Sequence, residues 1–212
     1  MDLKHLKKGG WQINIKYFKN YVIKTPKTKE EIRKRITPYY ERIGNKERIE
    51  EKIKKLKKEW KDSIKIVKSG AVPLRLLAYP EFLKGGKVKQ KRVRMLYEEF
   101  EILMSRKKIR EAKKLVDKVV DFILILWSYG VHEVTFKFYA QMGLLDGEIV
   151  LVDLGELTSD KKVVKKQILK GHKKLEDSRQ SHHDEILDYY QAQIKKRLTV
   201  DRLNKVWNQA KK

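Results

Sequence analysis

The stretch that decides the fold is Glu148-Ile149-Val150-Leu151-Val152-Asp153-Leu154-Gly155. Four consecutive apolar residues before Asp153 predict a buried strand. A glycine follows Asp153 two positions later. A carboxylate at the end of such a strand can hold a divalent cation beside a phosphate group. Asp and Gly are also common turn residues, so this stretch by itself is equally compatible with an ordinary turn.

Length and composition indicate a folded, water-soluble chain. Its 212 residues are 41% hydrophobic, which is enough for one large domain or two small units with a real core. The absence of cysteine excludes disulfides and thiolate chemistry and fits a reducing interior, so we expect a cytoplasmic protein. The polar start predicts no signal peptide. The most apolar run, 119–127, contains Asp121 and is too short to span a bilayer, so no membrane span is expected.

The net charge of +24 and the pI of about 9.9 make the chain strongly basic. A field of this sign attracts nucleic acids, nucleotides and anionic lipids. An abundance of both Lys and Glu is also typical of proteins adapted to high temperature, and here the basic residues are spread along the whole chain. Charge alone therefore leaves a polyanion partner and a thermal adaptation both open.

Strand patterns dominate the first 95 residues. Alternating apolar and polar residues predict half-buried strands over 11–17 and 21–24, with a turn at 19–20 between them. A further edge strand is expected over 88–93. Residues 74–83 contain a proline and are expected to form short extended pieces.

Helical patterns occur between these strands and over most of the chain after residue 95. Thr28 and Glu31 form a capping-box pattern that begins a helix, which Pro38 is expected to interrupt. Apolar residues spaced three and four apart predict further helices at 49–60, 96–104, 109–127 and in three pieces after residue 160. Residues 131–143 are expected to be irregular. Strands early and helices late are typical of the α+β class.

Together these pieces resemble the protein-kinase-like superfamily in a small, degenerate form. The resemblance rests on Tyr21-Val22-Ile23-Lys24, the buried helix ending at Trp127, the loop 132–143 and the stretch that ends at Gly155. It covers roughly residues 9–160. It implies a two-lobed fold, with a β-rich N-terminal lobe over 1–95 and a shortened, mainly helical C-terminal lobe over 96–212. That second lobe would carry the metal-site hairpin and a helical tail.

The resemblance also implies a nucleotide cleft that takes ATP and Mg²⁺. Lys24 resembles the strand lysine that grips the phosphates, and Asp153 resembles the aspartate that holds magnesium. Gln141, 153 − 141 = 12 residues earlier, lies near the usual place of a metal-binding Asn. Gly10 belongs to a reduced phosphate loop, Gly9-Gly10. Glu41 is the marginal favourite to pair with Lys24, and Glu47, Glu50 and Glu51 remain alternatives.

Several parts of the family pattern are missing. The phosphate loop lacks its third glycine, and the catalytic-base position falls on Phe136. The nearest acid is Glu133, beside His132, so these two are the candidate catalytic residues. A second cluster, His182-His183-Asp184 with His172 nearby, could suggest a metal, but adjacent histidines on a helix point to different faces.

The sequence therefore predicts a kinase-like nucleotide-binding protein. It would be either a pseudokinase, which binds nucleotide without chemistry, or a weak ATP-dependent phosphotransferase. The alternative is a basic nucleic-acid-binding protein without catalysis. The expected partners are a nucleotide and a polyanion, either protein or nucleic acid.

Overall fold

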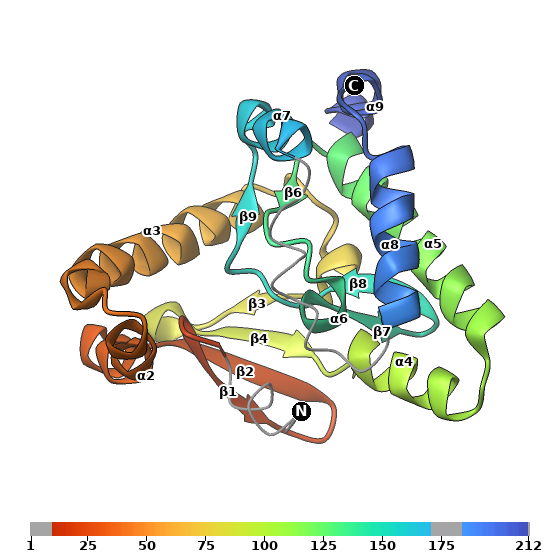
Figure 1. Ribbon diagram of the computed structural model, residues 1–212. Helices are drawn as coiled ribbons and strands as arrows, with labels where there is room; N and C mark the ends of the chain where they lie inside the picture. Colours follow the sequence, from red (N-terminus) through yellow and green to blue (C-terminus); the bar gives the residue numbers. More distant parts are fainter. Residues whose placement is uncertain (1–9, 171–183, 212) are drawn as a thin grey trace.

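The computed structural model describes residues 10–170 and 184–211 and has an α+β fold with antiparallel sheets and several helices (Figure 1). Its strands are β1 Ile13–Tyr17, β2 Tyr21–Pro26, β3 Glu81–Phe82, β4 Val88–Lys91, β5 Arg94–Met95, β6 His132–Glu133, β7 Met142–Leu145, β8 Glu148–Leu151 and β9 Leu157–Thr158. Its α-helices are α2 Lys29–Arg42, α3 Ile49–Lys68, α4 Leu96–Ser105, α5 Ile109–Ser128, α6 Phe138–Gln141, α7 Lys161–Leu169, α8 Asp184–Arg197 and α9 Val200–Val206. Short 3-10 turns are η1 Lys46–Arg48, η2 Leu74–Leu77, η3 Lys84–Gly86 and η5 Gln209–Lys211.

The largest sheet is antiparallel and has the strand order β1-β2-β4-β3. The backbone N–H of Phe18 donates to the carbonyl of Tyr21, which closes the turn predicted at residues 19–20. Lys24 pairs with Ile15 on one side and with Val88 on the other. Because successive strand residues point to opposite faces, Val22 and Lys24 share one face of this sheet. That face turns toward the rest of the protein, and both side chains are buried.

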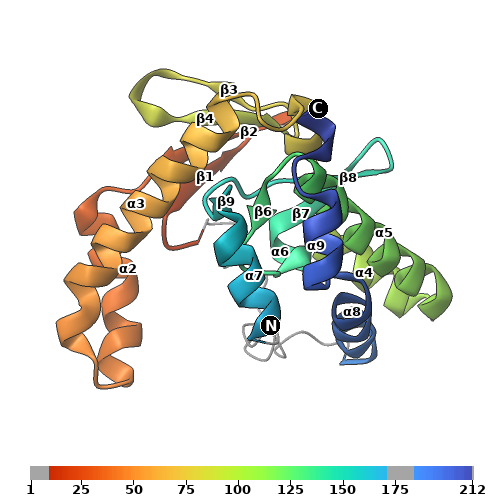
Figure 2. The same cartoon turned by 90° about the horizontal axis from the view of Figure 1, so that it is seen from above.

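Helices α2 and α3 form a hairpin that projects from the body of the protein (Figure 2). The capping box of Thr28 and Glu31 begins α2 as predicted. Pro38 lies inside α2 and does not interrupt it, so that expectation was wrong. The apolar face of α2 packs against α3 in a separate small cluster, Ile32, Ile36, Ile53 and Leu56, and this burial offsets the backbone hydrogen bond that proline cannot make.

The main core is built around α5, the helix that the sequence predicted most clearly. Its buried face includes Val116, Val119 and Trp127, and the core continues from Ile13 in β1 to Leu203 in α9. Helix α8 lies beside α5 (Figure 1), and the Tyr189 hydroxyl donates to Asp117 across this contact. In the described residues no helix combines the length and the apolar character needed to cross a bilayer.

Two loop regions contain more structure than the sequence pattern indicates. Residues 74–83 include the 3-10 turn η2 and only two strand residues, because Ala78 and Tyr79 adopt left-handed backbone conformations that end the extended path. The loop over 132–143 contains β6 and the one-turn helix α6. These elements position the site, because the backbone carbonyl of Gln141 accepts hydrogen bonds from the N–H groups of Val152 and Asp153.

Candidate functional site

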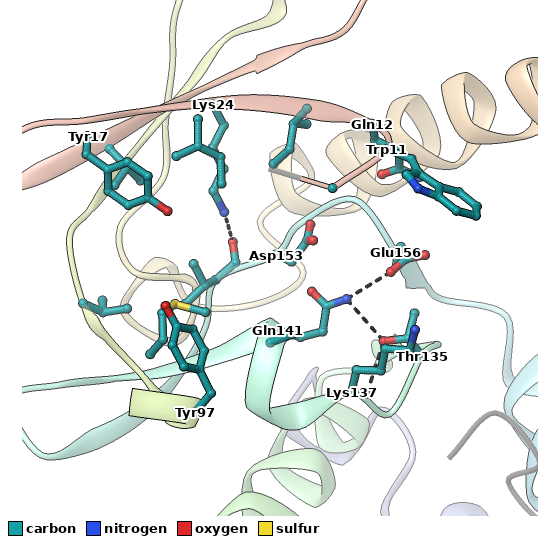
Figure 3. A pocket seen from close by; sticks show the side chains of 18 of the residues that line it. Trp11, Gln12, Tyr17, Lys24, Tyr97, Thr135, Lys137, Gln141, Asp153 and Glu156 are labelled. Atoms are coloured by element: carbon teal, nitrogen blue, oxygen red, sulfur yellow. Dashed lines mark hydrogen bonds between the residues drawn. The ribbon is translucent and has the colours of Figure 1, made fainter. Parts of the chain in front are cut away.

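A cavity of about 790 Å³ lies between the four-stranded sheet and the segments around α6 and β8 (Figure 3). The sheet contributes Ile15, Val22 and Lys24 to its wall. The opposite wall carries polar side chains, namely Thr135, Gln141, Asp153 and Glu156. The structure therefore brings Lys24, Asp153 and Gln141, three residues that the sequence singled out, to a single cavity.

Lys24 is one of several basic residues that line this cavity, and it is only 2% exposed. Its Nζ donates to the backbone carbonyl of Val152 at 2.5 Å, directly before Asp153. Burial lowers the pKa of Lys24 to about 8, and the nearby carboxylate of Asp153 opposes that shift. A buried ammonium group has lost most of its hydration. An anionic ligand would compensate for that loss, so this site favours an anion.

Asp153 is held by the tight turn that follows it. Its Oδ1 accepts from the backbone N–H of Gly155 at 2.9 Å. A Cβ at position 155 would lie 2.3 Å from Gln12 Oε1 and 3.2 Å from the ring of Trp60. A side chain at position 155 would therefore displace the end of Gln12 and press on Trp60, so glycine favours the turn that follows Asp153.

The side-chain carbonyl oxygen of Gln141 is an unsatisfied hydrogen-bond acceptor within the described part of the chain. Its side chain is 6% exposed, and its Nε2 donates to Thr135 Oγ1 at 3.3 Å and to Glu156 Oε2 at 3.1 Å. Its Oε1 is buried and has no hydrogen-bond partner among the described residues. Figure 3 shows this oxygen on the side of Asp153. A buried acceptor without a donor is costly, and a bound cation would satisfy it.

Glu156 and Thr135 were missed by the sequence reasoning. Glu156 adds a carboxylate to the cavity wall, three residues after Asp153. Helix α3 anchors the segment that follows Glu156, because the Ser63 hydroxyl accepts a hydrogen bond from the N–H of Leu157 and donates one to the Leu157 carbonyl. The sequence shows Glu156 three residues after Asp153, which could have suggested a further ligand. Its neighbours in the sequence do not indicate that its side chain points into the cavity.

Glu133 and His132 lie behind the cavity and do not line it, so the structure does not support the expectation that they act on a ligand directly. Glu133 accepts from the N–H groups of Thr135 and Phe136 and from the Thr135 hydroxyl, at 2.6 to 2.9 Å. Burial, followed by the negative charge of Glu156, raises its pKa to about 8. His132 Nδ1 accepts from the indole N–H of Trp127 at 3.0 Å. Both side chains therefore organise the loop that carries Thr135.

The predicted pairing of Lys24 with Glu41 was wrong. Glu41 ends the projecting helix α2 and pairs with Lys46 at 2.9 Å. The alternatives are also engaged elsewhere, since Glu50 pairs with Arg33 at 2.7 Å and Glu51 lies 3.8 Å from Arg48, while Glu47 lies exposed in η1. The helical hairpin carries these acids away from the sheet, a tertiary effect that sequence spacing does not reveal.

Gly10 lines the cavity, and its carbonyl accepts from Lys27 Nζ at 2.7 Å. Its neighbour Gly9 and the three histidines of the second cluster, His172, His182 and His183, lie outside the described residues. Within the described ranges, no group of three or more His, Asp or Glu side chains could hold a metal by itself. A metal at Asp153 would therefore need ligands from a bound molecule.

Comparisons with known proteins give no relative for this chain. No family model matches it, and neither a curated protein nor a solved structure does. Any functional assignment therefore rests on the geometry of the site.

Proposed function

We propose that this chain is a kinase-like nucleotide-binding protein whose cavity takes ATP with Mg²⁺. The observation that supports this proposal best is that Lys24 and Asp153, which lie 129 positions apart (153 − 24), line the same cavity. A buried ammonium and a carboxylate on facing walls suit a triphosphate whose charge is shared by a lysine and a metal ion. In this proposal the sheet with α2 and α3 is the N-terminal lobe, and the segments after residue 95 form the C-terminal lobe.

The metal would be held by oxygen atoms of the cavity wall. Asp153, the Gln141 side-chain carbonyl and Glu156 would supply protein ligands, and phosphate oxygens would supply the rest. Mg²⁺ is commonly held by one or two carboxylates together with substrate phosphates, so the lack of a complete protein cluster among the described residues fits this arrangement. The ion would satisfy the buried oxygen of Gln141 that has no partner now.

The apolar part of the cavity suits a nucleobase. Its wall includes Ile15, Val22, Val93, Met95 and the ring of Tyr97, which together form a slot for a flat, weakly polar group. Gly10 offers open space, because a Cβ at this position would meet nothing within 4 Å. The phosphates would then lie between Gly10, Lys24 and Asp153.

The chemistry of the opposite wall favours binding over efficient phosphoryl transfer. Phe136 occupies the expected base position, is 3% exposed and donates its backbone N–H to Glu133. Glu133 reaches the cavity only through the hydroxyl of Thr135. A general base must lie within hydrogen-bond reach of the proton that it removes, so we infer a pseudokinase or a slow phosphotransferase.

A thermal-shift titration tests the proposal. Mg-ATP should raise the Tm of the wild type, because a ligand that binds only the folded state stabilises it, by about 2.7 kcal/mol at a hundredfold excess over Kd. The shift should vanish in Asp153→Ala and persist in Asp188→Ala, which removes an exposed carboxylate from α8. An unchanged shift in Asp153→Ala would refute the proposed site.

Release of labelled phosphate then separates the two forms of the proposal. Transfer of the γ-phosphoryl group by the wild type, abolished in Asp153→Ala, would identify a phosphotransferase. Binding without transfer would identify a pseudokinase.

A further inference from the structure

The four-stranded sheet has a second face, which points away from the cavity. Its strands pair so that Lys16 lies opposite Ile23, Ile23 opposite Lys89, and Lys89 opposite Glu81. In the next row Tyr21 lies opposite Lys91. Because side chains alternate between faces, these rows lie on the side opposite to Val22 and Lys24. We call this side the outer face.

Aromatic rings and lysines interleave on the outer face. The rings of Phe18 and Tyr21 stack with centroids 4.4 Å apart and planes at 14°. Each of three rings has an ammonium within reach of a cation–π interaction, namely Lys16 over Phe18 at 5.3 Å, Lys89 over Tyr21 at 5.3 Å and Lys91 over Tyr79 at 4.4 Å. These six residues are called the aromatic–lysine platform below.

The backbone at Tyr79 adopts a left-handed conformation. Its φ is 52° and that of the preceding Ala78 is 53°, and two successive non-glycine residues in the left-handed region are strained. Ala78 is fully buried, whereas Tyr79 is 46% exposed. The carbonyl of Ala78 accepts from the N–H of Lys91, which fixes the ring beside that lysine. The left-handed backbone ends the 3-10 turn η2, where the N–H of Tyr79 donates to the carbonyl of Leu74, and it leaves the ring of Tyr79 exposed beside Lys91.

The charge of the outer face is complementary to a polyanion. Lys16, Lys89 and Lys91 lie among the rings, and the exposed Lys19 of the β1–β2 turn adjoins them. Glu81, which also lies on the outer face, forms a salt bridge with Lys89 at 2.8 Å. The whole chain carries a net charge of +24, so its long-range electric field also attracts a polyanion.

We propose that the aromatic–lysine platform binds single-stranded nucleic acid. Unpaired bases stack on flat rings, and phosphates pair with lysines, which is the combination that sequence-tolerant single-strand binders use. An acidic peptide would satisfy the lysines but would leave the stacked rings unused. Five of the six platform residues do not line the cavity, whereas Lys91 also lines it, so this binding shares one lysine with the nucleotide site proposed above.

The test is fluorescence anisotropy with a labelled 20-nucleotide oligo(dT) at two salt concentrations, with the full chain as the protein. The wild type should bind, with an affinity that falls steeply as salt rises. Tyr21→Ala should weaken binding about 5- to 150-fold, since one stacked base contributes about 1–3 kcal/mol. Tyr39→Ala removes an exposed tyrosine from α2 and should leave the affinity unchanged.

A second pair of variants tests whether the position of a positive charge matters. Lys89→Met on the platform should weaken binding more than Lys61→Met on α3, although both remove one positive charge. The proposal is overturned if Tyr21→Ala and Tyr39→Ala bind equally well, or if poly-glutamate competes as effectively as oligo(dT). Circular dichroism of each variant shows whether the fold is retained.

Discussion

The two faces of the four-stranded sheet place the same residue type in opposite environments. Lys24 in β2 points inward, is 2% exposed and has its pKa lowered to about 8 by burial. Lys89 in the neighbouring strand β4 points outward, and its pKa is raised by the hydrogen bond and charge of Glu81. The strands that carry them are hydrogen-bonded partners. The pKa of a lysine in this sheet therefore depends on the face to which its side chain points, because side chains on the inner face are buried and lose their hydration.

The largest expected difference between the faces is in packing. Ile13→Ala should lower the free energy of unfolding by about 2–5 kcal/mol, because its side chain is 4% exposed and belongs to the main core. Ile23→Ala, on the partly exposed outer face, should cost about 1 kcal/mol or less. Urea denaturation of both variants measures the contrast, and equal losses would contradict the assignment of the two faces.

The pH dependence of stability should reveal Lys24. Its folded pKa of about 8 lies below the ordinary value of 10.5, so between these values the unfolded chain holds a proton that the folded chain has released. Stability therefore rises with pH across this window, by about 3 kcal/mol at most from a shift of this size. The free energy of unfolding of the wild type, measured against that of Lys24→Met, should show this rise from pH 8 to 10.5.

Lys89→Met is the matched control for this titration. Its comparison with the wild type should show no rise over the same range, since the pKa of Lys89 is shifted in the opposite direction. If the difference between the wild type and Lys24→Met were also flat over this range, Lys24 would be hydrated in solution.

Glycine substitutions test the turn that holds Asp153. Gly155→Ala should cost about 1–3 kcal/mol, because the new methyl group must displace Gln12 and press on Trp60. Gly10→Ala meets no atom within 4 Å and should be tolerated. Thermal unfolding of the two variants measures the difference. If Gly155→Ala is neutral, the close approach of Gln12 is not a constraint.

The smallest effect is expected for the exposed ion pair of the outer face. Lys89→Met removes a contact with Glu81, whose side chain is 59% exposed, and solvent and salt weaken such a pair. No measurable change in Tm is therefore expected. A clear loss of stability would show that the outer face is structural, which would weaken the case for a binding platform.

Local patterns in the sequence were sufficient to predict much of the fold. The alternation before Lys24, the capping box at Thr28 and the long apolar face that ends at Trp127 were confirmed, because each depends on neighbours within a few residues. The α+β class followed from their order. The interpretation of Pro38 was wrong, because packing between α2 and α3 offset its local preference.

The candidate site was harder to predict, because it depends on contacts between distant segments. The sequence nominated Lys24, Gln141 and Asp153, and the structure places all three around one cavity. It gave no reason to select Glu156, whose inward direction depends on the anchoring of β9 to Ser63. It also favoured Glu41, which the projecting hairpin carries away from Lys24. Burial of Glu133 behind Thr135 likewise appears only in three dimensions.

A crystal soaked with Mn²⁺ and a non-hydrolysable ATP analogue tests the central claim most directly. Anomalous scattering locates the manganese without ambiguity, and the nucleotide density gives the position of the phosphates. We predict a manganese ion bonded to Asp153 and to the side-chain oxygen of Gln141, with a phosphate against Lys24. A nucleotide bound elsewhere, or a cavity that stays empty at saturating ligand, would contradict the account.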